Sequence, residues 1–164
     1  MQVWRICKRI YKDTSFSGIG GLKGSMRWHH KGHLIVYTSS SLSLATLESW
    51  VQPDPHRALT NYVSVCAHIP DDLLVERIDE AILPMDWRTP DSPGSSLLRD
   101  IGTEWLLTQS SAVLRVPSAV TISEFNYLLN PAHAGFREIQ QQDPVPFEYD
   151  RRMWRTKKGS DDLS

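Results

Sequence analysis

Short runs of β-branched and aromatic residues, separated by glycine, proline and polar residues, predict several short strands along the chain. These runs cover residues 3–6, 34–37, 62–68, 112–116, 119–122 and 145–149. In the third run Val63, Val65 and Ala67 alternate with more polar residues, which is the period-2 pattern of a half-buried strand. Asn130 and Pro131 predict a turn after the fifth run.

Apolar residues at helical spacing predict a helix that begins near residues 39–41 and runs to about Val51. The three serines at its start offer N-cap hydroxyls, and Pro53 and Pro55 end it. Its apolar stripe consists of Leu44, Leu47 and Val51. Glu48 lies on the same side of the helix as this stripe, so the pattern places a carboxylate on the apolar side.

The rest of the pattern adds further helices and loops. It predicts a second helix over residues 97–107 and a short helix over residues 71–82. The glycine-rich stretch 15–24 and the proline-rich stretch 84–96 are expected to be loops. The polar end of the chain from Arg151 onward is expected to fray.

This mixture of short strands and two or three helices predicts one α+β domain with a central, mostly antiparallel sheet and flanking helices. A length of 164 residues fits a single domain with a core of its own. We assign the domain to residues 1–152 and a polar tail to residues 153–164. No internal repeat is visible, which excludes solenoids and propellers.

Charge narrows the classes of function. The chain has 18 Lys and Arg against 19 Asp and Glu, which argues against a general binder of nucleic acid or anionic membranes. Residues 1–33 hold seven bases and one acid, whereas residues 71–104 hold nine acids and three bases. These blocks are either solvated faces or, for the basic block, part of a site for an anion.

The expected compartment is the cytoplasm. No apolar stretch is long enough to span a bilayer, and the start of the chain lacks the apolar region of a signal peptide. Cys7 and Cys66 are too few for a disulfide scaffold and do not form a CxxC motif, so we expect two reduced thiols.

The glycine-rich loop does not match a known phosphate-binding motif. A GxGxxG pattern would need glycine where Lys23 stands, and a Walker A loop would need Gly-Lys-Ser where the chain reads Lys23, Gly24, Ser25. The loop is therefore either a mobile surface loop or one whose amides turn toward an anion beside Arg27.

Other chemistries have little support in the sequence. His29, His30 and His33 lack a neighbouring carboxylate or thiolate and do not match HExxH, so we expect surface histidines and no metal. No GxSxG elbow marks a serine nucleophile. His133 is either catalytic or, as we favour, an exposed or capping histidine.

Several short motifs follow one another in a characteristic order. In the first half they are Val3-Trp4-Arg5-Ile6, Ser17-Gly18-Ile19-Gly20-Gly21, Met26-Arg27-Trp28, Gly32, Val36-Tyr37-Thr38-Ser39, Leu44-Ala45 and Leu47-Glu48. In the second half they are Ile69-Pro70-Asp71-Asp72-Leu73, Leu83-Pro84, Trp87, Gly102, Trp105, Val116-Pro117-Ser118, Asn126-Tyr127-Leu128-Leu129-Asn130-Pro131, His133, Phe147 and Asp150-Arg151. With these motifs the chain resembles the RES-domain family, the toxin half of Xre–RES toxin–antitoxin pairs, over about residues 3–152.

The resemblance implies an enzyme on an ADP-ribosyltransferase-like fold that degrades NAD+ by cleaving the nicotinamide–ribose bond. NAD+ is then a substrate, water or inorganic phosphate accepts the ADP-ribosyl group, and no cofactor is expected. The resemblance also implies a cognate Xre-type DNA-binding antitoxin that blocks the active site and forms a hetero-oligomer with the toxin. This chain itself is expected to contact neither nucleic acid nor membrane.

The same resemblance carries four catalytic positions over to this chain. They are the arginine of the Arg-Trp motif, the tyrosine of the next strand, the helix glutamate and the serine after Val-Pro, which are Arg27, Tyr37, Glu48 and Ser118. The family usually reads Gly-Gly-Arg-Trp-Asn where this chain reads Ser25-Met26-Arg27-Trp28-His29. The change beside the arginine bears on the geometry of that loop.

The chemistry of these residues suggests their roles. Glu48 is expected to stabilise positive charge on the ribose, and the nicotinamide leaves as a neutral ring that needs no general acid. Arg27 is expected to bind the pyrophosphate with its guanidinium fork. Tyr37 is expected to pack against nicotinamide or ribose, and Ser118 to hydrogen-bond to one of them. The expected substrate-binding set is Arg27, Tyr37, Trp28, Gly20 and Ser118.

Alternatives remain open at this stage. For Trp28 and Asn130 a structural role is also expected, and each catalytic candidate has an ordinary reading as an ion-paired glutamate, a surface arginine, a core tyrosine or a turn serine. The same site can instead transfer ADP-ribose to a protein acceptor. A third possibility, from another class, is a catalytically idle domain that binds a partner.

Overall fold

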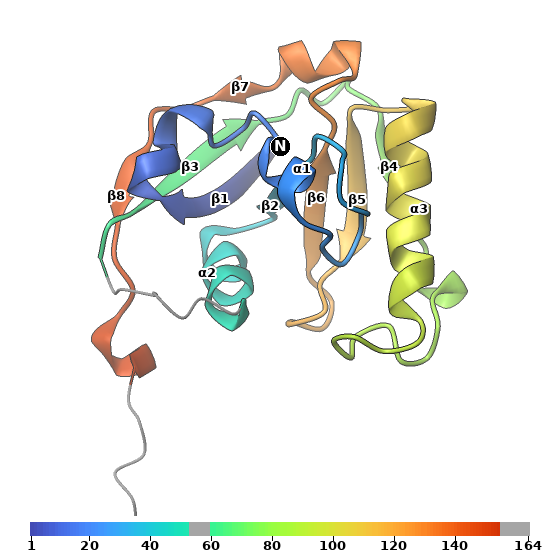
Figure 1. Ribbon diagram of the computed structural model, residues 1–164. Helices are drawn as coiled ribbons and strands as arrows, with labels where there is room; N and C mark the ends of the chain where they lie inside the picture. The colour runs from blue at the N-terminus through green and yellow to red at the C-terminus, as the bar shows by residue number, and fades with distance from the viewer. Residues whose placement is uncertain (53–59, 155–164) are drawn as a thin grey trace, which may run out of the picture.

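Eight strands form one central sheet in the computed structural model, which describes residues 1–52 and 60–154 (Figure 1). The strands are β1 (Gln2–Lys8), β2 (Val36–Ser39), β3 (Tyr62–His68), β4 (Val75–Arg77), β5 (Val113–Pro117), β6 (Phe125–Leu129), β7 (Gln140–Gln141) and β8 (Val145–Phe147). Their order is β4-β5-β6-β2-β1-β3-β7, and β8 also pairs with β3. Among the described pairings only β4 with β5 is parallel, so the predicted α+β domain with a mostly antiparallel sheet is confirmed.

Helices flank this sheet, as expected. The α-helices are α1 (Gly20–Lys23), α2 (Leu42–Val51) and α3 (Ser95–Thr108), and the 3-10 helices are η1 (Arg9–Thr14), η2 (Glu80–Ile82), η3 (Ala134–Glu138) and η4 (Arg151–Trp154). Figure 1 shows α3 alongside β4 and β5, and α2 near the place where β1 and β2 meet. Within the described ranges, no helix has both the length and the apolar character needed to cross a membrane.

The sheet is weakly joined at one place, between β1 and β2. Seven register pairs join β1 to β3, and four join β2 to β6. In contrast, β1 and β2 share a single register pair, Trp4 with Ser39. The side chain of Arg5 crosses this junction, and its Nη1 donates to the carbonyl of Tyr37 at 2.8 Å. The junction therefore leaves space for side chains between two well-paired parts of the sheet.

The helix α3 positions the part of the molecule next to this junction by packing against it. Its buried side chains pack on β5 and β6 in a cluster that includes Trp28, Trp87, Leu98, Trp105, Leu114, Val116 and Leu128. Gly102 permits the close approach of this helix, because a Cβ at that position would lie 1.8 Å from the carbonyl oxygen of Trp28. The helix thus fixes the backbone next to Arg27.

The segment 71–82 is not the predicted helix. Its residues 75–77 form β4, which pairs in parallel with residues 113–115 of β5, and a single 3-10 turn follows. Asp79 caps that turn by accepting a hydrogen bond from the amide of Ala81 at 3.0 Å. Pairing with a distant strand overrides the local helical pattern here.

The predicted strand over 119–122 is also wrong. Ser118 begins a turn there, because its Oγ accepts hydrogen bonds from the amides of Val120 and Thr121. The strand comes three residues later as β6, which pairs with both β5 and β2.

The buried face of α2 differs from the predicted stripe. Leu44 and Ala45 are buried, whereas Leu47 and Val51 are 40% and 55% exposed. Glu48 still points inward, because it follows Leu44 by four residues. Pro53 and Pro55, the predicted helix stops, lie outside the described residues.

Smaller differences concern the strands and loops. β2 begins at Val36 rather than at residue 34, and β3 is buried on both faces up to His68 instead of being half-buried. The glycine-rich stretch contains the single helical turn α1. Residues 151–154 of the expected frayed end form a 3-10 turn, and the rest of that end, residues 155–164, lies outside the described residues.

The cysteines are unpaired thiols, as predicted. Cys7 is partly buried on β1 and Cys66 is buried on β3. Burial raises the pKa of both thiols, so neither has the lowered pKa of a reactive cysteine.

Candidate active site

Glu48 reaches the sheet because of how α2 begins. The hydroxyl of Ser41 caps the helix by accepting a hydrogen bond from the amide of Leu44 at 3.1 Å. Leu44 and Ala45 then pack inward, and one turn later the half-buried side chain of Glu48 faces β2 and β6.

One oxygen of Glu48 is fully engaged. Its Oε1 accepts from the Ser118 hydroxyl at 2.7 Å and from the Asn126 amide at 2.6 Å. The Asn126 carbonyl oxygen in turn accepts from the Ser39 hydroxyl at 2.7 Å. No described residue donates a hydrogen bond to the other oxygen, Oε2. The carboxylate is therefore held in one orientation with one oxygen left for a ligand.

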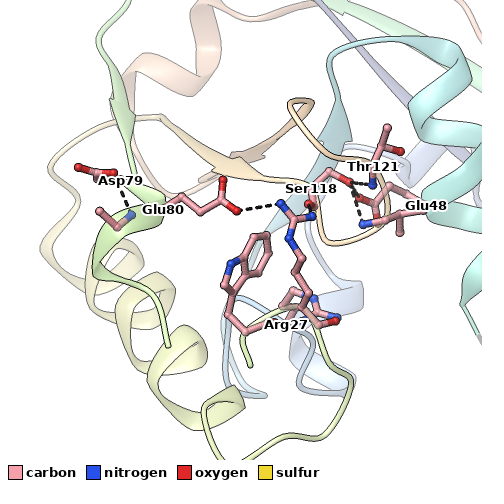
Figure 2. A network of polar contacts seen from close by, with 10 residues as sticks. Arg27, Glu48, Asp79, Glu80, Ser118 and Thr121 are labelled. Carbon is pink, nitrogen blue, oxygen red and sulfur yellow. Dashed lines mark hydrogen bonds and ion pairs between the residues drawn. The ribbon is translucent and has the colours of Figure 1, made fainter. Parts of the chain in front are cut away.

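Ser118 is held from two sides (Figure 2). Its hydroxyl donates to Glu48 and accepts from the amides of Val120 and Thr121 at 3.1 and 3.0 Å. Its carbonyl accepts from Arg88 at 2.8 Å, and Arg88 also pairs with Glu80 at 2.8 Å. Since Ser118 is fully buried, its contribution in this arrangement is to orient Glu48.

Arg27 binds the loop in front of the site. Its Nη1 donates to the carbonyl of Trp87, and its Nη2 donates to the carbonyl of Arg88 at 3.3 Å. Burial lowers the pKa of the Arg27 guanidinium, while the negative charge of Glu48 opposes that shift. Two of its donors are thus occupied by the protein, and its charge acts on the same space as Glu48.

Tyr37 lies between Arg27 and the glycine-rich loop. Its hydroxyl accepts from the amide of Trp28 at 3.2 Å and lies 2.9 Å from Nδ1 of His29. Burial raises the pKa of Tyr37, so the phenol stays protonated. The hydroxyl is therefore oriented by the two residues that follow Arg27, through the Trp28 amide and the His29 ring.

His29 is not the surface residue that the sequence suggested. It is fully buried, and burial lowers its pKa, although the backbone of Gly21 and Gly24 partly opposes the shift. His30 pairs instead with Asp100 at 2.6 Å. Within residues 1–52 and 60–154, no group of three or more His, Cys, Asp or Glu is arranged to hold a metal ion.

The remaining predicted residues fall into two groups. Gly20 lines a cavity, whereas Trp28 is buried against Trp87 with ring centroids 6.5 Å apart, which also agrees with a structural role. Asn130 is buried; its side chain donates to the carbonyl of Leu106 on α3 at 3.3 Å and accepts from the amide of Ala132 at 3.0 Å, so it closes its turn and ties it to the helix. His133 caps η3 by accepting from the amide of Gly135 at 3.0 Å, one of the two readings favoured from the sequence.

Two adjacent cavities meet at these side chains. The inner cavity, about 160 Å³, lies at the junction of β1 and β2 and is lined by Arg5, Gly20 and His29 among others. The outer cavity, about 470 Å³, is lined by Arg27, Trp28 and Arg88 among others. Both are lined by Met26, Tyr37, Glu48, Gln52 and Asn126. The free oxygen of Glu48 thus belongs to a cleft made of two compartments.

Sequence reasoning gives no role in this cleft to three of its residues, Ser39, Asn126 and Arg5. Ser39 was considered only as a helix cap, yet it orients Asn126. Arg5 was noted only as part of a motif and a basic block. The one available signal was the unusual number of polar residues within the expected strands, since a buried strand rarely contains arginine without a reason.

Comparisons with known proteins agree with this architecture. The family model described as the RES domain matches residues 2–150. The chain is 36% identical over 156 residues to "Toxin Res" of Yersinia enterocolitica, which covers 93% of this chain and 99% of the relative. It is 33% identical over 156 residues to the "Prs ADP-ribosylating toxin" of a Sphingobium species, covering 93% and 96%.

A solved structure shares the fold. It is the crystal structure of the M. tuberculosis MbcT–MbcA toxin–antitoxin complex, which matches with a TM-score of 0.66 over 90% of this chain and 84% of that chain. The sequence identity is 15%, so this match concerns the fold alone.

Proposed function

The chain belongs to the RES domain family, and from this premise we propose that it is the toxin of a toxin–antitoxin pair and that it breaks the nicotinamide–ribose bond of NAD+. The observation that supports this most is the Glu48 carboxylate, with Oε1 held by Ser118 and Asn126 and Oε2 open to the cleft.

One fixed carboxylate suffices for this reaction. As the bond between the nicotinamide nitrogen and the ribose C1 breaks, its electron pair neutralises the pyridinium ring, so no proton is needed by the leaving group. Positive charge develops on the ribose, and a preorganised anion stabilises it. Water or inorganic phosphate then bonds to C1, and a water nucleophile releases one proton to solvent.

Arg27 and Tyr37 would place the substrate. Arg27 retains guanidinium donors beyond the two that bind the loop carbonyls, and it lines the larger compartment, so we assign it the pyrophosphate. Tyr37 lines both compartments and is assigned contact with the nicotinamide or the ribose. NAD+ is the substrate in this scheme, phosphate is a candidate co-substrate, and no cofactor takes part.

A second candidate function is ADP-ribosylation of a protein. The printed name of the Sphingobium relative, an ADP-ribosylating toxin, favours it. The same carboxylate would serve both reactions, because only the acceptor of the ADP-ribosyl group differs.

The partner is proposed to be a cognate antitoxin that covers the cleft. The relatives called "Toxin Res" and the toxin–antitoxin complex that shares the fold support such a partner. We propose an Xre-type DNA-binding protein for this role and the cytoplasm as the place where the pair forms.

The test is to incubate the purified protein, freed of antitoxin, with NAD+ in phosphate buffer and in phosphate-free buffer. Chromatography follows nicotinamide and the ribosyl product. ADP-ribose would indicate hydrolysis, and a phosphorylated ADP-ribose would indicate phosphorolysis. With NAD+ labelled in its ADP-ribose part, label retained on an added protein would favour ADP-ribosylation. Absence of nicotinamide release in every condition, from folded protein, would contradict the proposal.

A further inference from the structure

Two arginines lie side by side on neighbouring strands without a counter-charge. Arg77 of β4 and Arg115 of β5 are register partners, so both side chains lie on the same face of the sheet. Among the described residues, no carboxylate lies within ion-pair distance of either guanidinium. The Nε of Arg115 is also enclosed without a hydrogen-bond partner. Like charges on neighbouring strands of one sheet face repel each other, so this pair on its own is unfavourable.

The pair lies on the face of the sheet that is turned away from the catalytic cleft. Side chains alternate between faces along a strand, and both neighbours of Arg115 on β5 pack in the cluster with α3. On β6 the register partner of Arg115 is Tyr127. The residue before it, Asn126, donates to Glu48 on the other face. Arg77, Arg115 and Tyr127 therefore form a row across three strands, which we call the arginine row.

A cavity of about 310 Å³ is lined by all three members of the arginine row. The Arg115 guanidinium lies over the ring of Phe125, with 4.0 Å between its central carbon and the ring centroid, and this contact helps to hold the planar group in place. The described lining contains one carboxylate, that of Asp71, which already pairs with the amino group of Met1 at 3.0 Å. The cavity thus brings together two arginine charges and no free anion.

We propose that this cavity binds a phosphate group, either as inorganic phosphate or as the phosphate of a small monoester. Two adjacent guanidinium groups offer N–H donors to several phosphate oxygens at once. A phosphate monoester carries a charge of about −1.5 to −2 at pH 7, which matches the two cations. Tyr127 lines the same cavity, and its hydroxyl is a further donor. The inference does not depend on the proposed function, because the site lies outside the cleft of Glu48.

A purely structural interpretation makes a different prediction. If Arg115 serves only to cover Phe125 and Arg77 only to keep the edge strand β4 in water, phosphate has no preferred place on this face. Replacing either arginine then relieves repulsion and leaves the affinity for phosphate unchanged. The two interpretations are therefore separated by a binding measurement that reports on this face alone.

The experiment follows backbone amides of the purified, nitrogen-15-labelled full chain by NMR at constant ionic strength. The probes are inorganic phosphate and glycerol 3-phosphate, and the variants are Arg115→Gln, Arg77→Gln and the control Arg9→Gln, whose side chain is exposed. We expect saturable shifts at residues 75–77 and 113–115 in the wild type. Each glutamine variant at the arginine row should bind about tenfold to a hundredfold more weakly. The control should stay within about twofold.

The two phosphate sources give different results. Saturation by inorganic phosphate alone identifies the free ion as the ligand, whereas tighter binding of glycerol 3-phosphate identifies a monoester. Wild-type protein without saturable shifts at residues 75–77 and 113–115 overturns the proposal, and so do shifts confined to residues 118–121 beside Glu48. Equal affinity of folded wild type and Arg115→Gln overturns it as well. Where Arg115→Gln does not fold, Arg77→Gln decides, because its side chain is exposed on an edge strand.

These measurements do not require turnover. A protein that releases no nicotinamide but binds phosphate at the arginine row would contradict the proposed reaction and leave this site in place. A protein that cleaves NAD+ and shows no shift at the arginine row would do the opposite.

Discussion

The polar groups at the two ends of the cleft differ in how far their hydrogen-bond partners are supplied by the protein. Around Glu48, the Ser39 hydroxyl donates to Asn126, and Asn126 and Ser118 both donate to one oxygen of the carboxylate. Around Arg5, a guanidinium nitrogen is enclosed without a partner. The Glu48 carboxylate is thus oriented by the protein before a ligand binds, as a preorganised catalytic group needs to be, and its second oxygen stays available. The second region keeps a buried donor without a hydrogen-bond partner, which is energetically unfavourable.

Removing the charge of Glu48 is the substitution from which we expect the largest effect on turnover. Glu48→Gln keeps the shape and one acceptor oxygen, so NAD+ should still bind within a few-fold of the wild-type affinity. Turnover should fall about 100-fold to 1,000-fold, because the ribose cation loses its anion. Nicotinamide release under saturating NAD+ measures the effect.

The matched control is Glu104→Gln on the exposed side of α3. It should leave turnover unchanged. A Glu48→Gln protein as active as the wild type would mean that the satisfied region is only structural.

The backbone next to Arg27 depends on the close contact of α3 with Trp28. Gly102→Ala would place a Cβ 1.8 Å from the Trp28 carbonyl oxygen, so helix or loop must move. We expect a loss of about 3 kcal/mol in the free energy of unfolding, at the upper end of typical overpacking, and a Tm lower by roughly 5–10 °C. Thermal unfolding followed by circular dichroism measures it.

Gly24→Ala provides the comparison, because a Cβ there meets nothing within 4 Å. An equal loss of unfolding free energy in both variants would show that the effect comes from losing the flexibility of glycine and not from the α3 contact.

How much of this arrangement the sequence predicts depends on the range of the interactions. The Ser41 cap and the inward carboxylate of Glu48 follow from local helix rules, and the structure has both. The strand β4 depends on pairing with β5, far away in the chain, so the local pattern there is misleading. The turn at Ser118 is local, but the hydrogen bonds of its hydroxyl with the amides of Val120 and Thr121 cannot be seen in a pattern of apolar residues.

The cleft was harder to predict than its carboxylate. Nothing in the residues near Arg5 tells that β1 and β2 share one pair, because strand pairing is a property of the whole sheet. The family resemblance gives catalytic roles to Arg27, Tyr37, Glu48 and Ser118, whereas Ser39 and Arg5 stand in its motifs without a role. The unpaired arginine became visible only once its surroundings were known.

Ser39 contacts Glu48 only through Asn126, so replacing Ser39 tests whether this indirect hydrogen bond helps to position the carboxylate. Ser39→Ala removes the hydroxyl that donates to Asn126 without touching the carboxylate. The Asn126 amide is then free to turn, so we expect turnover to fall about fivefold, the equivalent of about 1 kcal/mol, with little change in KM. Steady-state kinetics on NAD+ measure both.

Ser43→Ala on the exposed side of α2 is the control for that substitution. If KM rises and kcat does not change, Ser39 contacts the substrate instead of orienting Asn126.

The smallest effect concerns pH at the inner compartment. Burial holds the pKa of folded His29 below its unfolded value of about 6.5. The unfolded chain therefore binds a proton first as the pH falls, so the stability contribution is complete above about pH 7.5 and is lost as pH falls through 6.5 toward the folded pKa. His29→Asn removes the group, so its unfolding free energy should fall less steeply than that of the wild type between pH 8 and pH 5.5. Chemical denaturation at four pH values measures the two slopes, with His68→Asn at the exposed end of β3 as the control for losing one imidazole. Parallel curves for wild type and His29→Asn would show that the inner compartment is open enough to water for its histidine to titrate normally.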